Sequence, residues 1–341
     1  MLSDFRPTTF DEIVGQKEVV EELKLIIESS KITGNPPGHI LLLGPQGSGK
    51  STLAKVFCNT LGTNMKSVSA GNMDNWSKLL RTILELQDGD VLFMDEMHTI
   101  SNETQESLYI PMEDFIADIY NGRGKDARAA TIQLPRFTLI GATTHAGNLN
   151  LPLLRRFDHQ PQLTPYTINE LTEMVNKATN RMYEEECPKY IAHRIAQLSR
   201  TNASTAYSLL KNYKEIAVVL EKQLSPSEIL DKTIKLKKLD PWLGLDYSSR
   251  QYINALVAND YRPMGLERLS SVIKEKIETI KWVIEPFLFT VINIDDRIDS
   301  LVDVDRLGRK ATGLAGYYIN KCKTAQRELG LFPNEIFPSW I

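Results

Sequence analysis

The chain has 341 residues, of which 42% are hydrophobic and 24% charged, and its formal net charge is −3. This length is sufficient for two or three domains, and the near-neutral charge means that any DNA-binding surface must be local. Three widely separated cysteines without a Cys-x-x-Cys pair argue against zinc and disulfides and favour a reducing cytoplasm, and the sequence has neither a signal peptide nor an uninterrupted membrane-length apolar run.

The first part of the chain, about 160 residues, alternates short apolar runs with helical patterns, which is typical of a mostly parallel α/β sheet. Strands are expected at residues 40–43, 66–69, 91–94 and 137–142. A hairpin is expected between residues 116 and 134, because an Asn-Gly pair leads toward its tip and an apolar alternating run follows.

Helical spacing of apolar residues follows from about residue 167 to residue 236 and predicts a small helical domain. Residues 239–312 combine two or three helices with two short strand-like segments. Helices followed by a short hairpin indicate a winged helix-turn-helix. The last residues, 314–341, form a tail that is either a docking peptide or a packed helix, and we expect packing.

The most specific motif is GPQGSGKS at residues 44–51, placed between an expected strand and an expected helix. Glycines let successive backbone N–H groups point at phosphate oxygens, and the positive end of the helix adds to the same site. Lys50 would reach the β- and γ-phosphates of ATP, and the Ser51 hydroxyl would bind Mg²⁺. The predicted phosphate-binding residues are Gly44, Gly47, Ser48, Gly49, Lys50, Ser51 and Thr52. A glycine-rich turn that binds nothing is the alternative, and the next motif argues against it.

That second motif is the apolar run at residues 91–94 followed by Asp95 and Glu96. A buried parallel strand would carry both carboxylates at its carboxyl end. Asp95 would hold Mg²⁺, and Glu96 would orient and polarise the attacking water. Such a run is common at strand ends, but its position about 45 residues after a phosphate loop favours the ATPase interpretation.

A third motif, at residues 138–144, is a strand that ends in two threonines. Beside the phosphate-loop strand, such a hydroxyl can contact the γ-phosphate or the attacking water, which is the sensor-1 role. An ordinary threonine that caps the following turn fits the spacing equally well.

Arg155 and Arg156 form the fourth motif, just before the helical region. They cannot easily reach the γ-phosphate of their own chain, so the site of a neighbouring subunit is the better destination. An arginine supplied in trans stabilises charge on the transferring phosphoryl group and implies a ring or partial ring. A solvated basic turn is the alternative.

These four motifs, in this order, resemble those of AAA+ ATPases, and the segments between them resemble the RuvB family of bacterial Holliday-junction branch-migration motors. The segments that carry this resemblance are residues 5–16, 112–115, 134–147, 264–269, 284–288 and 307–312, together with the hairpin. The resemblance covers residues 4–313, and the hairpin separates this family from other AAA+ proteins.

The resemblance implies an α/β AAA+ P-loop domain with flanking helices, an α-helical lid domain and a C-terminal winged-helix domain. Their expected bounds are 1–161 with the hairpin 116–134, 162–236, 237–313, and a tail at 314–341. It also implies a homo-oligomer, a hexameric ring.

The resemblance further implies roles for individual residues. The adenine pocket would be formed by Phe5, Arg6, Ile13, Val14 and Tyr166. Thr144 would be sensor 1, and Arg156 would be the trans arginine finger. Arg309 matches the basic wing tip that contacts duplex DNA in the family.

The hairpin would dock a RuvA-like junction-binding partner. Its apolar residues Ile116, Ile119, Tyr120 and Ile132 suit such a contact, but they suit the core of the hairpin equally well.

The sequence departs from the family at the sensor-2 position, where Ser204 replaces an arginine. A serine cannot donate a fixed bidentate pair to phosphate oxygens. Arg200, one helical turn upstream, is a candidate substitute if the alignment slips.

The wing also departs from the family, because residues 262–312 contain as many acidic as basic side chains. Asp303 and Asp305 would repel phosphates, so the DNA contact narrows to Arg306, Arg309 and Lys310. A charge-balanced winged helix also serves as a protein–protein module.

Two functions from different classes therefore remain open. One is an ATP-driven motor that migrates branched DNA junctions. The other is a DNA-binding or assembly protein that uses ATP as a switch with little turnover, as Ser204 and the weakly basic wing would favour. A clamp-loader subunit is a third possibility, against which the hairpin and the winged unit argue.

Overall fold

The computed structural model describes residues 6–73, 75–121, 128–184, 186–220 and 222–329, without the side chains of 120, 121, 128, 129 and 325–329. The chain forms two compact units: Met1–Glu170 with Asn202–Ser204, and Leu171–Thr201 with Thr205–Ile341. Among the described helices, none combines the length and the apolarity that a membrane crossing requires.

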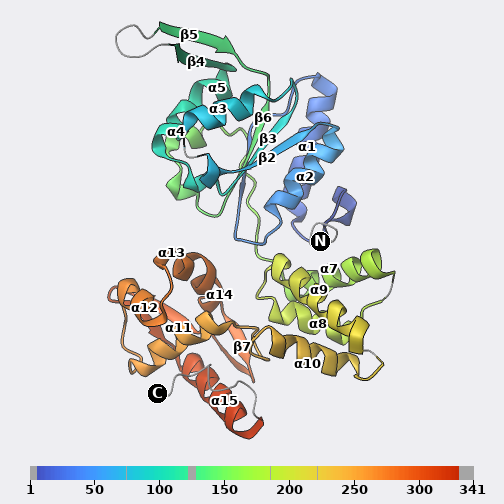
Figure 1. Ribbon diagram of the computed structural model, residues 1–341, viewed down its shortest axis with the longest axis vertical. Coiled ribbons are helices and arrows are strands. Elements are labelled where there is room, and N and C mark those ends of the chain that lie inside the picture. The colour runs from blue at the N-terminus through green and yellow to red at the C-terminus, as the bar shows by residue number, and fades with distance from the viewer. Residues whose placement is uncertain (1–5, 74, 122–127, 185, 221, 330–341) are drawn as a thin grey trace. The chain divides into compact units, whose positions relative to one another are not determined.

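A four-stranded parallel sheet forms the centre of the first unit (Figure 1). In spatial order its strands are β1 (Ile40–Leu43), β6 (Thr138–Thr143), β3 (Val91–Asp95) and β2 (Met65–Ser69). The strands that the sequence predicts are present, with each end within one residue. β1, β3 and β6 are buried almost throughout, as strands covered on both faces should be.

Helices cover both faces of this sheet (Figure 1). On one face, α1 (Lys17–Thr33) and α2 (Lys50–Leu61) pack against Ile40 and Leu42 of β1. On the other, α3 (Trp76–Leu84) and α5 (Tyr109–Glu113) contribute to the cluster that contains Leu41, and α4 (Asn102–Ser107) contacts α3 and α5. Alternate residues of one strand therefore enter opposite cores. Short turns complete the unit: η2 (Phe10–Glu12), η3 (Ala70–Asn72), η4 (Met97–Thr99), η6 (Ala146–Asn148) and α6 (Leu151–Leu154).

The expected hairpin consists of β4 (Ile116–Asn121) and β5 (Arg128–Gln133), paired in antiparallel register from Ile116–Gln133 to Asn121–Arg128. Ala117 is buried in the adjacent core, and Ile119 and Ile132 pack partly against the same core. The base of the hairpin therefore uses these isoleucines for packing. Its tip and the side chain of Tyr120 lie outside the described residues.

Apart from the first residues of α7 and α9, four amphipathic helices belong to the second unit: α7 (Ile168–Tyr183), α8 (Lys189–Leu198), α9 (Ala203–Leu220) and α10 (Pro226–Leu236). A capping box stops α10 from fraying, because the Ser225 hydroxyl accepts the Glu228 N–H and the Glu228 carboxylate accepts the Ser225 N–H.

The winged-helix part follows with α11 (Tyr247–Ala258), α12 (Leu266–Ile273), α13 (Ile277–Thr279), the π-helical turn η7 (Ile280–Ile284) and α14 (Glu285–Leu288). Two hairpins come next: β7 (Ile292–Ile294) with β8 (Arg297–Asp299), and β9 (Val302–Asp305) with β10 (Gly308–Ala311). The final helix, α15 (Gly313–Leu329), contributes Leu314, Tyr318 and Cys322 to the same core as Tyr252 of α11. The first part of the expected tail is thus a packed helix.

Candidate nucleotide site and nucleic-acid interface

The phosphate-binding loop connects β1 to α2 and depends on three glycines with positive φ: Gly44 (148°), Gly47 (75°) and Gly49 (99°). Side chains are excluded there, because a Cβ on Gly49 would lie 2.8 Å from the Tyr166 hydroxyl and a Cβ on Gly44 would lie 2.8 Å from a backbone oxygen. Gly49 is the N-cap of α2 and makes no side-chain cap bond. The first N–H groups of α2 are therefore not taken by a capping side chain, as an anion site at a helix N-terminus requires.

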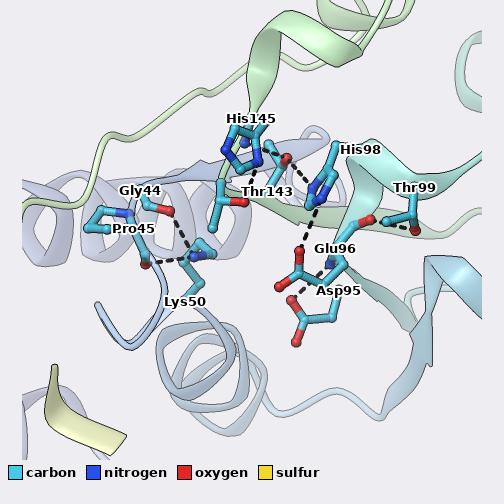
Figure 2. Close-up of polar contacts among 10 residues, drawn as sticks. Gly44, Pro45, Lys50, Asp95, Glu96, His98, Thr99, Thr143 and His145 are labelled. Atoms are coloured by element: carbon cyan, nitrogen blue, oxygen red, sulfur yellow. Dashed lines mark hydrogen bonds and ion pairs between the residues drawn. The ribbon is translucent and has the colours of Figure 1, made fainter. Parts of the chain in front are cut away.

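Lys50 lies across this loop, as Figure 2 shows. The residue is 8% exposed, and its Nζ donates to the carbonyl oxygens of Gly44 and Pro45, each at 2.9 Å. Burial lowers the pKa of Lys50, while the carboxylates of Asp95 and Glu96 oppose that shift. The three charged groups predicted from separate motifs thus interact at one end of the sheet.

Asp95 and Glu96 lie where β3 ends, and Asp95 Oδ1 accepts the backbone N–H of Glu96 at 2.9 Å. Glu96 has a φ of 54°, a left-handed conformation that costs a residue with a side chain about 1–3 kcal/mol. Ser51, on the first turn of α2, supplies a hydroxyl. A hydroxyl with a carboxylate oxygen is a donor set suited to Mg²⁺, so Ser51 and Asp95 fit this ion.

A chain of polar contacts connects Glu96 to the end of β6 (Figure 2). Glu96 Oε2 lies 3.4 Å from His98 Nε2, and His98 Nδ1 lies 3.1 Å from Thr143 Oγ1. Thr143 Oγ1 also accepts the backbone N–H of His145, whose Nδ1 lies 2.6 Å from Thr144 Oγ1. His98 belongs to none of the four sequence motifs, although its position two residues after Glu96 was a signal that could have pointed to it.

Thr143 and Thr144 differ in their surroundings. Thr143 is the last residue of β6, is 1% exposed and pairs in register with Leu43 of β1. Thr144 is half-buried, and its hydroxyl contacts His145. Burial lowers the pKa of His145, and nearby His98 and Lys50 lower it further. Both threonines lie at the end of the sheet that carries the phosphate loop, and the sensor-1 role of Thr144 stays a prediction.

Arg156 is held within the first unit. It donates to the carbonyl oxygens of Tyr109 (3.2 Å) and Pro152 (2.9 Å), pairs with Glu113 at 3.0 Å and lies over the Tyr109 ring. Arg155, next to it, is exposed. The guanidinium of Arg156 therefore has a defined orientation in a single chain.

The residues expected on the adenine side come from the N-terminal segment and Tyr166. The Gln16 side chain forms reciprocal hydrogen bonds with the backbone of Thr164, which ties the two segments together. A Cβ on Gly15 would lie 3.3 Å from the Tyr166 ring, and the Tyr166 hydroxyl lies beside Gly49. Val14 is buried, Ile13 is half-buried, Arg6 is exposed, and Phe5 lies outside the described residues.

The wing places its basic residues differently from the expectation. Arg309 lies in β10 and not at the tip, because the turn between β9 and β10 falls at Arg306 and Leu307. Its guanidinium pairs with Glu285, which is 3% exposed, at 2.8 Å and 3.4 Å. The Tyr252 hydroxyl donates to the same carboxylate at 2.7 Å. Arg306 is exposed, whereas Arg309 and Lys310 are both half-buried, so Arg306 is the most accessible of the three.

Comparisons with known proteins agree with this architecture. A family model described as the Holliday junction DNA helicase RuvB P-loop domain matches residues 5–163, and one described as the RuvB C-terminal winged helix domain matches residues 242–319. A relative from Pseudothermotoga lettingae, named Holliday junction branch migration complex subunit RuvB, is 33% identical over 316 residues, which cover 92% of this chain and 89% of the relative. The chain belongs to the RuvB family. A second RuvB subunit, from Campylobacter hominis, is 36% identical over 290 residues, 84% of each chain.

Solved RuvB structures show the same fold. The Thermotoga maritima RuvB Holliday junction branch migration motor matches with a TM-score of 0.80 and 30% identity, over 93% of this chain and 98% of that one. A variant of the same protein matches with a TM-score of 0.81. The predicted family and the predicted fold class, a parallel-sheet P-loop domain with a C-terminal winged helix, are thus confirmed.

The segment where the RuvB family carries its sensor-2 arginine contacts the phosphate loop through its backbone and an amide. Asn202 Nδ2 donates to the Gln46 carbonyl and the Ala203 N–H donates to the Gly47 carbonyl, each at 3.3 Å. Ser204 is exposed on the first turn of α9. Arg200, the candidate substitute, pairs with Asp246 at 3.2 Å within the second unit.

Proposed function

We propose that this protein is an ATP-dependent DNA motor that drives Holliday junction branch migration in recombination and repair. The observation that carries the proposal is the convergence of Lys50, Asp95 and Glu96 at one end of the sheet in a chain of the RuvB family. Its relatives are named as branch migration subunits, and the Thermotoga structure is named as a branch migration motor.

The residues divide the hydrolytic work. The N–H groups of the loop and of the first turn of α2 bind the phosphates, and Lys50 exchanges its two carbonyl partners for β- and γ-phosphate oxygens. Ser51 and Asp95 would hold Mg²⁺, which would supply positive charge beside the phosphates. Glu96 takes a proton from water as the water oxygen bonds to the γ-phosphorus and the bond to the bridging oxygen breaks.

A neighbouring subunit completes the site. Arg156 stabilises the charge of the transferring phosphoryl group across a subunit boundary, so that hydrolysis requires a ring, which we propose is hexameric. Glu113 and Tyr109 orient Arg156 for this contact. Hairpin β4–β5 docks a RuvA-like partner, and the wing contacts duplex DNA through Arg306 and Lys310.

Two observations favour the second candidate, an ATP-switched assembly protein with little turnover. Ser204 cannot report on phosphate as an arginine would. Arg309 is paired with a buried carboxylate, which reduces the charge available to DNA. A clamp-loader role is not favoured, because the family matches extend to the winged-helix domain.

Steady-state ATP hydrolysis, measured with and without a synthetic four-way DNA junction, separates the two candidates. We expect turnover that junction DNA stimulates and that Glu96→Gln lowers roughly 100-fold or more while ATP stays bound. Glu103→Gln, on an exposed glutamate of α4, is the matched control and should retain turnover. Tight ATP binding without turnover in the unchanged protein would exclude the motor.

A further inference from the structure

The position of His98 between Glu96 and Thr143 is not explained by the four motifs (Figure 2). Its two ring nitrogens face different partners: Nε2 faces the Glu96 carboxylate at 3.4 Å, and Nδ1 faces the Thr143 hydroxyl at 3.1 Å. The side chain of His98 is 15% exposed, whereas that of Glu96 is 43% exposed. A largely buried ring therefore lies against a water-accessible carboxylate.

The partners of His98 indicate which ring nitrogen carries the proton. An ionised Glu96 carboxylate can only accept, so the contact at Nε2 is a hydrogen bond only when Nε2 is protonated. Thr143 Oγ1 accepts the N–H of His145, and because a hydroxyl can accept and donate at once, it can also donate to an unprotonated Nδ1. On this basis we assign the imidazole proton to Nε2, where it faces Glu96.

The turn that connects Glu96 and His98 is also fixed. The Thr99 N–H and the Thr99 hydroxyl both donate to the Glu96 carbonyl, each at 2.9 Å. Together with the left-handed backbone of Glu96, these bonds determine the direction in which its Cα–Cβ bond leaves the chain. The remaining freedom is the rotation of the glutamate side chain, and His98 is placed to restrict it.

We propose that His98 is a positioning residue for the general base: its Nε2–H holds one carboxylate oxygen of Glu96 so that the other faces the attacking water, and Thr143 fixes the ring. The proposal rests on the proposed ATP hydrolysis. A neutral N–H suits this role, because a permanent cation such as lysine would depress the basicity of the carboxylate it holds. The 3.4 Å contact tightens when substrate binds, as catalytic hydrogen bonds often do.

Kinetics provide the first test. His98→Ala should slow single-turnover ATP hydrolysis about 10- to 100-fold with little change in ATP affinity, because orientation of the base is lost. His98→Gln, whose amide can still donate from the corresponding position, should restore most of the rate. The matched control is His159→Ala, since His159 also faces a glutamate, Glu22 at 3.9 Å in the same unit. An unchanged rate in His98→Ala, or a loss of ATP affinity as large as the loss of rate, would overturn the proposal.

The tautomer provides a second test that does not depend on turnover. The chain has five histidines, so side-chain ¹⁵N resonances of the full-length protein can be assigned by single substitutions. We expect His98 in the Nε2–H form at neutral pH and a shift of its Nε2 resonance in Glu96→Gln. An Nδ1–H tautomer, or no response to Glu96→Gln, would refute the positioning role. Absent ATP turnover with the expected resonances would instead contradict the proposed function.

Discussion

The nucleotide site and the wing differ in the surroundings of their charged residues. In the first unit, Lys50, Asp95 and Glu96 are drawn together at the edge of a buried sheet, where each charge influences the next. In the wing, Arg309 is neutralised internally by Glu285, and Asp303 and Asp305 lie exposed beside the exposed Arg306. A motif that binds a small, highly charged substrate needs a fixed geometry, whereas a duplex contact needs accessible charge.

This difference reflects how strongly each sequence pattern constrains the surroundings of its charged residues. The phosphate loop and the acidic strand end are local patterns whose geometry follows from the elements they lie on. The position of a basic residue in a hairpin does not determine whether its side chain is available to DNA, because a buried carboxylate nearby can pair with it instead. Measurements of ATP turnover, of stability and of the salt dependence of duplex affinity test this contrast between the two regions.

The largest effect, on ATP turnover, is expected for substitution of Arg156. Arg156→Ala should lower turnover roughly 1,000-fold while ATP binding is retained, because a trans arginine acts on the transition state. Mixing this variant with Lys50→Ala subunits should restore partial ATPase activity, since each supplies the group that the other lacks. Arg155→Ala, at the exposed neighbour, is the control and should have a small effect. Loss of ATP binding in an intact ring would contradict the trans role.

A smaller effect, on stability, is expected in the wing. Arg309→Ala leaves the Glu285 carboxylate buried without its cation and should destabilise the folded protein by about 3 kcal/mol, seen as a lower urea midpoint. Arg306→Ala should leave the urea midpoint unchanged and should instead lower the slope of log duplex affinity against log salt by about 1. If Arg309→Ala is as stable as the parent and lowers the slope of log duplex affinity against log salt as Arg306→Ala does, then Arg309 contacts phosphate.

The smallest effect, on the pH dependence of stability, is expected for substitution of His39, which precedes β1. Leu139 N–H donates to its Nδ1 at 2.9 Å, and its Nε2 lies 2.9 Å from the Met112 carbonyl, so the buried ring is held neutral. Burial lowers the pKa of His39 below its ordinary value of 6.5. The unfolded chain therefore binds a proton at His39 more readily than the folded protein does. The contribution of His39 to the free energy of unfolding is fully present above pH 6.5. It declines as the pH falls below 6.5, by at most about 1.4 kcal/mol per pH unit.

Hydrogen exchange of β1 and β6 amides at pH 7.5 and 5.5 measures this effect within the first unit. His39→Gln should reduce the loss of protection at the lower pH, whereas His193→Gln, at an exposed histidine of α8, should not. His145 contributes in the same direction, so the difference between variant and parent is the quantity to compare. An equal loss of protection in both would show that His39 does not titrate in this range.

Local patterns predicted the sheet strands, the hairpin and the phosphate loop to within a residue or so, because glycine geometry and apolar runs act over short distances. Patterns did not reveal that Arg156 pairs with Glu113, or that Arg309 pairs with Glu285, since both contacts join residues far apart in the chain. Nor did they reveal that His98 lies between Glu96 and Thr143, which depends on the parallel pairing of β3 with β6.

The sequence by itself determined the family, the fold class and the position of the phosphate-loop motif, because those depend on residue type and spacing. Tertiary structure alone decided which side chains are already engaged: Arg309 by a buried carboxylate, Arg156 by Glu113, and Glu96 by a histidine fixed through Thr143. The physical reason is that a charged side chain pairs with the partner that the fold brings within a few ångströms, and burial strengthens that pairing.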